Sequence, residues 1–283
     1  MLDASMILAD GRSLAYTDCG LSDGPLVIYF HGSPTSRLDV VGHDDSFNSL
    51  GVRVVAPDRP GIGGSTAQPG RALNDWPADV AALADHLEAE RFAVMGYSAG
   101  GPYAVACASL LQLRVASAGI VAGLTDMAWP GAADGLDEED LIMFGLDDEN
   151  AAAAWCEAHY GADGSRYFPR PGEPGPADAA WLAEESNLEG IIAMVTEAFR
   201  QGVAGMAQDM HVLGRPWAFD PATITAPVRV LQGEADTNVP AAHSRHTAEL
   251  IPNASLVLFP DHAHLSISNE IPQLAADLAS HLE

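Results

Sequence analysis

The stretch Phe92–Gly101, FAVMGYSAGG, joins a short apolar run to a Gly-x-Ser-x-Gly turn, and a helical pattern follows at once. The run predicts a buried strand over 92–95, and the small apolar residues of 99–113 predict a helix packed inside the protein. A serine on such a strand-to-helix turn has a strained backbone and projects from the carboxyl edge of a sheet. Ser98 is therefore a candidate nucleophile, and the Ala99 amide is a candidate oxyanion donor. The alternative is a tight turn with an unreactive serine.

The rest of the chain repeats this pairing of apolar runs with helical patterns. The runs are rich in Val, Ile, Leu and Phe and do not alternate cleanly with polar residues, which is typical of parallel strands buried on both faces. Helical patterns separate them, as at 74–87, 240–251 and 271–282. We expect an α/β fold with a mostly parallel central sheet of about eight strands, flanked by helices. The other runs are Leu26–Phe30, Val52–Ala56, Ala116–Ala122, Val228–Leu231 and Leu256–Phe259.

Residues 125–220 interrupt this rhythm. Several helical patterns occur there without a convincing strand, and the Pro- and Gly-rich stretch 166–178 joins them. The strand pattern resumes at Val228. The sequence therefore predicts an all-helical insertion, a cap or lid over 125–220, between the two parts of one core domain at 1–124 and 221–283.

A second loop with chemical potential follows the run Leu26–Phe30. It reads HGSPTSR, His31–Arg37, and Gly32 lets the backbone face a site without a side chain in the way. The Ser33 amide is then a second candidate oxyanion donor beside that of Ala99. An ordinary Gly/Pro turn, with His31 as a packing residue, is the other interpretation.

A serine nucleophile needs a base to take its proton and an acid to orient the base. Asp236 follows the run Val228–Leu231, and His262 and His264 follow the next one. Each lies just beyond a predicted strand, where the ligand sites of open α/β sheets are found. Asp236 is the preferred acid, with Asp126 as the main rival and Glu234 close by.

Five stretches together resemble the α/β-hydrolase fold superfamily, in its serine-nucleophile branch with a helical cap. They occur in the family order and span almost the whole chain. The resemblance implies a cap that roofs the site, and a Gly-rich structural loop at Asp58–Ser65 to which we assign no chemistry. Serine rather than aspartate at the turn argues against dehalogenases and epoxide hydrolases. The stretches are HGSPTSR, DRPGIGGS, GYSAGG, LQGEADTNVP and PDHAHLS.

The same resemblance separates the two histidines. An apolar residue usually follows the base in this family, and His264-Leu265 matches that pattern, which leaves His262 at the rim or surface. Ala263 stands where the family often has glycine. If that position needs a positive φ, alanine would be strained there, and His262 stays open as the base.

The triad implies a hydrolase, most simply one that cleaves an ester, a lactone or a related carbonyl compound through an acyl-enzyme. Acyl transfer or perhydrolysis on the same triad is the first alternative. A non-catalytic ligand receptor on this scaffold is the second. On this scaffold the cap and the pocket, and not the fold or the triad, determine which substrate is bound.

The net charge and the composition limit the classes of partner that we expect for this protein. The formal net charge of the 283 residues is −26, and all 13 basic side chains are arginines, so nucleic acid and membrane surfaces are not expected partners. We expect a small, neutral and partly apolar substrate. No Cys, His or acidic cluster has metal-ligand spacing and no dinucleotide motif has its context, so no metal and no cofactor are expected. Three scattered cysteines and the lack of a signal-peptide pattern indicate a cytoplasmic protein.

Overall fold

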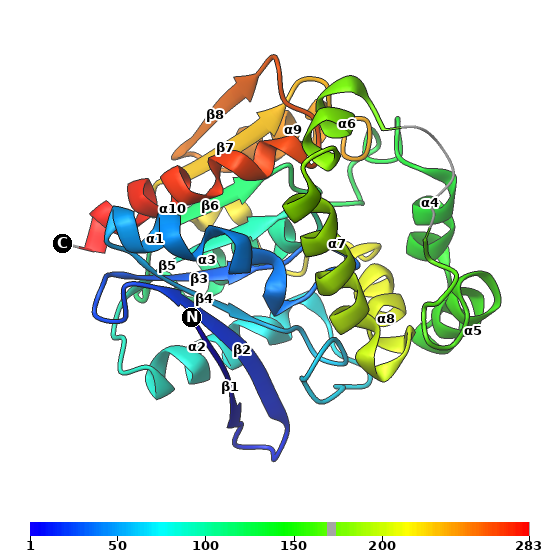
Figure 1. The fold of residues 1–283 in the computed structure, drawn as a ribbon, viewed down its shortest axis with the longest axis horizontal. Coiled ribbons are helices and arrows are strands. Elements are labelled where there is room, and N and C mark those ends of the chain that lie inside the picture. Colours follow the sequence, from blue (N-terminus) through cyan, green and yellow to red (C-terminus); the bar gives the residue numbers. More distant parts are fainter. Residues whose placement is uncertain (169–173, 283) are drawn as a thin grey trace.

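The computed structural model describes residues 1–168 and 174–282. Across them, eight strands form one sheet in the order β1-β2-β4-β3-β5-β6-β7-β8 (Figure 1). Only the β1–β2 and β2–β4 pairs are antiparallel, so the predicted mostly parallel sheet of about eight strands is confirmed. The strands are β1 (Leu2–Ile7), β2 (Ser13–Gly20), β3 (Leu26–Phe30), β4 (Arg53–Pro57), β5 (Phe92–Tyr97), β6 (Val115–Val121), β7 (Val228–Gly233) and β8 (Ala254–Phe259).

Helices cover both faces of the sheet, which explains why its central strands lack a polar side. Along β3, Val27 and Tyr29 pack in the cluster that includes α10, whereas Ile28 and Phe30 pack in the cluster that includes α2 and α3. Successive side chains of a strand point to opposite faces, so both faces must be apolar. The core helices are α1 (Asp44–Leu50), α2 (Trp76–His86), α3 (Gly101–Leu110), α9 (Ala241–Leu250) and α10 (Ile271–Ala279).

Between β6 and β7, the residues that the structure describes form helices joined by turns and loops, and they contain no strand. These helices gather to one side of the sheet, on the right in Figure 1, where α8 packs against both α4 and α5. Part of the predicted Pro/Gly stretch, residues 169–173, lies outside the described residues. The helices are α4 (Glu138–Gly145), α5 (Glu149–Tyr160), α6 (Pro176–Leu182), α7 (Glu185–Ala198) and α8 (Ala204–Leu213). We call them the inserted helices.

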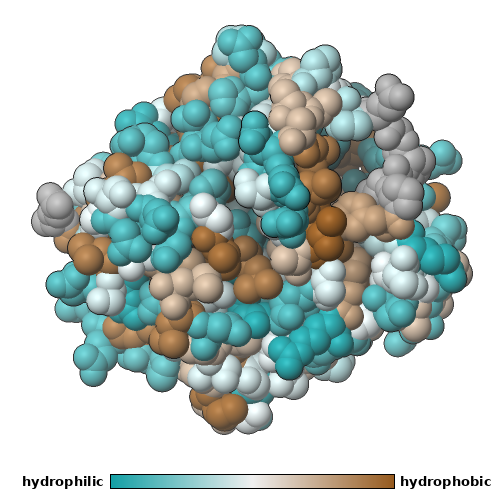
Figure 2. Space-filling view, viewed as in Figure 1, coloured by the Kyte–Doolittle hydropathy of each residue, from teal (hydrophilic) through white to brown (hydrophobic). Residues whose placement is uncertain are grey.

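Short 3-10 segments connect many of these elements. Two of them matter for the site, because η3 follows β5 directly and η6 lies between β8 and α10. On the surface, Figure 2 shows an apolar strip over α7, where Leu188 and Ile192 are exposed. The 3-10 segments are η1 (Arg37–His43), η2 (Leu73–Asp75), η3 (Ser98–Gly100), η4 (Phe199–Gln201), η5 (Pro221–Thr223), η6 (Ser266–Glu270) and η7 (Ser280–Leu282).

Candidate active site

Ser98 occupies the turn between β5 and η3 with a φ of 53°. That is the left-handed region, which costs a residue with a Cβ roughly 1–2 kcal/mol. Glycines on either side make the turn tight: a Cβ on Gly96 would collide with the Gly100 carbonyl, and one on Gly100 would collide with the Phe30 carbonyl. The end of β5, the serine turn and the backbone of β3 are therefore packed closely together at Ser98. Helix α3 begins later, at Gly101, than the predicted helix at 99, because η3 takes the first turn.

His264 and Asp236 meet Ser98 in a continuous hydrogen-bonded chain. His264 Nε2 lies 3.1 Å from Ser98 Oγ, and His264 Nδ1 lies 2.8 Å from Asp236 Oδ2. A carboxylate accepts from Nδ1–H, which leaves Nε2 as the acceptor for the serine proton. The three side chains come from the ends of β5, β7 and β8, at one edge of the sheet. This arrangement can deprotonate the serine hydroxyl and hold the resulting imidazolium.

Asp236 is held by donors other than the histidine. Its Oδ1 accepts from the Asn238 and Val239 amides, each at 2.9 Å, and its Oδ2 accepts from Gln232 Nε2 at 3.0 Å. Burial disfavours the charged carboxylate, but the charge and hydrogen bond of His264 and the two amides outweigh it, so the pKa of Asp236 lies below its ordinary value. The acid is fixed in place and ionised.

The loop that carries His264 is anchored from two directions. Tyr97 donates its hydroxyl to the His264 carbonyl at 2.7 Å, from the end of β5. Asp178 Oδ1, on α6, accepts from the Leu265 and Ser266 amides at 3.0 Å each. One of the inserted helices therefore contributes directly to the position of the imidazole.

The HGSPTSR loop, residues 31–37, packs against the serine turn. A Cβ on Gly32 would lie 3.5 Å from the Ser98 Cβ. The Gly32 amide donates to Asp39 Oδ2 at 3.4 Å, whereas no described residue accepts a hydrogen bond from the Ser33 amide. Ala99 is the second residue of η3, and the first amides of a helix have no partner within it. Ala99 therefore directly follows Ser98 in η3, and Ser33 directly follows the glycine that packs against Ser98.

The profile of the alpha/beta hydrolase fold matches residues 25–270. The chain belongs to the alpha/beta hydrolase fold family. Its membership agrees with the resemblance predicted from the sequence, and it makes this chain an enzyme of the hydrolase class.

Known proteins are similar to this hydrolase along almost its whole length. A bifunctional esterase/perhydrolase of Acinetobacter calcoaceticus is 30% identical over 280 residues, which cover 95% of each chain. A non-heme chloroperoxidase of Streptomyces lividans is 29% identical over 275 residues, covering 95% of this chain and 96% of the relative. Among solved structures, a hydrolase from Pseudomonas aeruginosa PA01 is 26% identical with a TM-score of 0.69, covering 99% of this chain and 98% of that one.

The rival residues of this hydrolase lie in other surroundings. His262 Nε2 lies 3.6 Å from Glu270 Oε1, and no hydrogen bond among the described residues joins His262 to Ser98. Ala263 is not among the residues with positive φ, so alanine is unstrained there. Asp126 accepts from the amides of Ala128 and Trp217 instead of from a histidine, and Glu234 is exposed.

Sequence reasoning missed what Asp58 and Arg59 do. They begin the stretch DRPGIGGS, to which we assigned no chemistry, yet both bind the HGSPTSR loop. Asp58 accepts from the Arg37 amide at 2.6 Å and from Arg37 Nη1 at 2.7 Å, and the Arg59 amide donates to His31 Nε2 at 3.2 Å. The order of the strands could have indicated this contact. Strands β3 and β4 are parallel neighbours, so the charged residues that directly follow β4 lie at the same edge of the sheet as His31, which directly follows β3.

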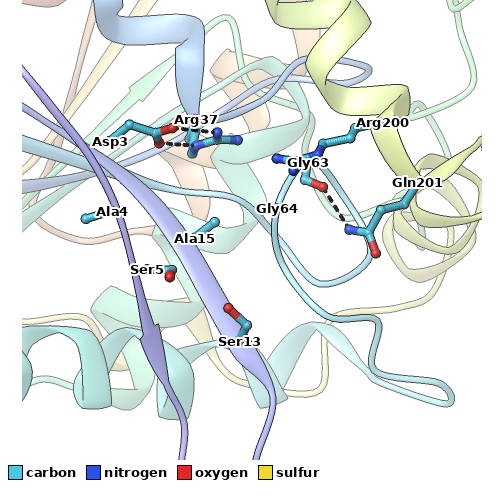
Figure 3. Close-up of a pocket in the computed structure, with 10 residues that line it drawn as sticks. All are labelled: Asp3, Ala4, Ser5, Ser13, Ala15, Arg37, Gly63, Gly64, Arg200 and Gln201. Atoms are coloured by element: carbon cyan, nitrogen blue, oxygen red, sulfur yellow. Dashed lines mark hydrogen bonds and ion pairs between the residues drawn. The ribbon is translucent and has the colours of Figure 1, made fainter.

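Arg37 also borders a surface pocket that is separate from the triad. Figure 3 shows it against Asp3, with Gly63 and Gln201 joined to each other at the other wall. Besides Asp3 and Asp58, the Arg37 guanidinium contacts Glu197 of α7 at 2.6 Å. Carboxylates therefore already compensate its charge, and we assign the pocket no ligand.

The residues that the structure describes contain neither a candidate metal site nor a candidate membrane-spanning helix. No group of three or more His, Cys, Asp or Glu side chains within 1–168 and 174–282 could hold a metal ion. Over the same residues, no helix combines the length and the apolar character needed to span a bilayer.

Proposed function

We propose that the protein is a serine hydrolase that cleaves an ester, a lactone or a related carbonyl compound. The observation that carries the proposal is the hydrogen-bonded chain from Ser98 through His264 to Asp236. A strained serine turn, an oriented imidazole and an ionised acid are the components of nucleophilic acyl transfer. The relative named an esterase/perhydrolase supports the same class.

In the proposed mechanism, Ser98 Oγ attacks the carbonyl carbon while its proton passes to His264 Nε2. The carbonyl oxygen becomes an oxyanion, which accepts hydrogen bonds from the Ser33 and Ala99 amides. Asp236 stabilises the imidazolium, which then protonates the leaving alcohol. Water, deprotonated by His264, attacks the acyl-enzyme and releases the acid and the free Ser98 hydroxyl.

We further propose that the inserted helices, within 125–220, form a cap that shapes the substrate pocket. Contacts of α6 with the segment that follows His264 support this proposal. Asp178 binds the amides of Leu265 and Ser266, and Trp181 Nε1 donates to Asn269 Oδ1 at 3.2 Å. The net charge of −26 favours a neutral substrate over an anion. All three cysteines are free and buried, which fits our proposal of a cytoplasmic location.

A fluorophosphonate probe tests the nucleophile. We expect one equivalent to react, the adduct to map to Ser98, and hydrolysis of short p-nitrophenyl esters to disappear in proportion to labelling. Asp236 and His264 make this hydroxyl reactive, whereas no other serine hydroxyl among the described residues bonds to a histidine ring. Label on another serine, or labelled protein with full esterase activity, would contradict the proposal.

Perhydrolysis is the second candidate, because the relative at 30% identity is named for both activities. In that reaction hydrogen peroxide replaces water as the nucleophile toward the acyl-enzyme, and a peracid replaces the acid. The p-nitrophenyl ester assay with peroxide present separates the two: peracid formed at a rate that exceeds acid release identifies a perhydrolase.

Activity should fall at low pH because His264 must be neutral to accept the Ser98 proton. Burial opposes its charged form, but the charge and hydrogen bond of Asp236 outweigh burial, so the pKa of His264 lies above its ordinary 6.5. The acid limb of kcat/KM for a neutral ester should therefore have its midpoint above 6.5. Asp178→Asn keeps an oxygen acceptor but removes a negative charge that also favours the imidazolium, so its midpoint should move to lower pH. A wild-type midpoint at or below 6.5 would contradict this.

A further inference from the structure

A fully buried ion pair contacts the HGSPTSR loop, and the proposed mechanism does not use it. Arg59 follows β4, and Asp209 belongs to α8, 150 residues further along the chain. Arg59 Nη2 lies 2.7 Å from Asp209 Oδ2, and both side chains are completely shielded from solvent. Burial disfavours the Asp209 charge, but Arg59 and Arg71 outweigh it, so the pKa of Asp209 lies well below its ordinary value. Both side chains are therefore charged inside the protein. A buried ion pair offsets the cost of desolvation only if its hydrogen-bond geometry is good.

The Arg59 guanidinium also reaches the backbone of the loop. Its Nη1 donates to the His31 carbonyl, and its Nη2 donates to the Gly32 carbonyl at 2.9 Å. The Gly32 carbonyl accepts a second bond, at 2.7 Å, from His31 Nδ1. His31 Nε2 accepts from the Arg59 amide, so His31 is neutral with its proton on Nδ1. Burial and then the Arg59 charge hold the pKa of His31 well below its ordinary value, in keeping with this neutral form.

These bonds determine where two peptide groups point. In a trans peptide the carbonyl and the N–H lie on opposite sides. The His31–Gly32 peptide is held on both sides, by Arg59 at its oxygen and Asp39 at its N–H. The Gly32–Ser33 peptide is also trans, and it is held only at its oxygen. Its N–H, which belongs to Ser33, is directed away from Arg59 and has no acceptor among the described residues.

We propose that Arg59 is a positioning residue for the oxyanion hole, and that Asp209 couples α8 to it. The inference rests on the proposed function, since it concerns the amide of Ser33. Arg59 fixes the Gly32–Ser33 peptide before substrate arrives, so no reorganisation is needed when the oxyanion forms. A charged donor on the carbonyl also polarises the peptide and makes its N–H a stronger donor.

Arg59→Lys tests the proposal, with Arg71→Lys as its matched control. Lysine keeps the charge, but it cannot hold Asp209 and two carbonyls with one planar group. Arg71 is also buried, binds the same carboxylate at 2.6 Å and the Tyr103 hydroxyl at 2.7 Å, and makes no hydrogen bond to the loop. Both variants should lose thermal stability to a similar extent, so a general effect of packing would appear in both.

The kinetic results should differ. We expect Arg59→Lys to lower kcat for p-nitrophenyl butyrate about 10- to 100-fold with KM within about threefold, and to weaken inhibition by phenylboronic acid by a similar factor. Arg71→Lys should keep kcat within about threefold. Equal kcat losses in the two variants, or a loss confined to KM in Arg59→Lys, would overturn the proposal. If the wild type is neither labelled by a fluorophosphonate nor inhibited by the boronic acid, the proposed function fails instead.

A structure of the phosphonylated wild type keeps the test open if Arg59→Lys does not fold. The phosphonyl oxygen should lie within hydrogen-bond distance of the Ser33 amide, while Arg59 keeps both carbonyls and Asp209. Release of Arg59 from the loop, or a Ser33 amide turned away from the phosphonyl group, would refute the positioning role.

Discussion

Ser98→Ala should lower kcat/KM for ester hydrolysis by about 10⁴-fold or more while the protein remains folded. The change removes Oγ, which is the proposed attacking atom and the partner of His264 Nε2 at 3.1 Å. It keeps the Cβ, so the backbone cost of a φ of 53° is the same in both proteins. Circular dichroism and a melting temperature within a few degrees of the wild type should show that the fold is intact.

Ser109→Ala is a suitable control for this variant. Ser109 lies on α3, is also buried, and uses its hydroxyl to bind the Asp220 carbonyl at 3.1 Å, away from the triad. The control should lose some stability and keep its kcat. Folded Ser98→Ala protein with wild-type turnover would exclude Ser98 as the nucleophile and, with it, the proposed mechanism.

His264→Ala should cost about as much as Ser98→Ala, because the serine then has no base. His262→Ala, two residues earlier, should keep kcat/KM within about threefold, since its imidazole faces Glu270 and Phe259. Steady-state kinetics of both variants at one pH above the acid limb measure this contrast. The double variant Ser98→Ala/His264→Ala should be no slower than Ser98→Ala alone, because residues that act as one unit are not additive. A large loss in His262→Ala with an active His264→Ala would reverse the assignment.

Much of this architecture follows from local sequence signals. Buried parallel strands are continuous apolar runs, so β3 to β7 leave a readable pattern. The edge strand β8 is only partly buried, but it also carries an apolar run. The candidate nucleophile, acid and base each follow such a run within a few residues. The edge strand β1 is harder to recognise, because it is largely exposed and carries polar residues in LDASMI. β2 lies inside the sheet, but polar residues interrupt its sequence SLAYTDCG, so neither strand was assigned from a run of its own. The helix at α3 was placed correctly but begins after a 3-10 turn.

What the sequence could not provide is pairing over long distances. Arg59 and Asp209 are 150 residues apart, so no local sequence pattern predicts that they form an ion pair. Neither residue belongs to a motif that would identify the other as its partner. The choice between His262 and His264 depended on the backbone at Ala263, which has no positive φ in the structure. Composition predicted an acidic surface but could not reveal that arginines would be used internally, as at Arg59 and Arg71.

Asp178 and Asp209 have a consequence for protein engineering. Grafting the segment between β6 and β7 from a relative is an obvious way to change the substrate preference of such an enzyme. Here that segment supplies the carboxylate bound to the amides of Leu265 and Ser266, and the counter-ion of Arg59. A foreign segment without acids at both places would remove the counter-ion shared by the buried Arg59 and Arg71 and would leave two amides without acceptors. We therefore expect viable chimeras to be those whose donor segment carries both acids, or those in which the host arginine is replaced together with the graft.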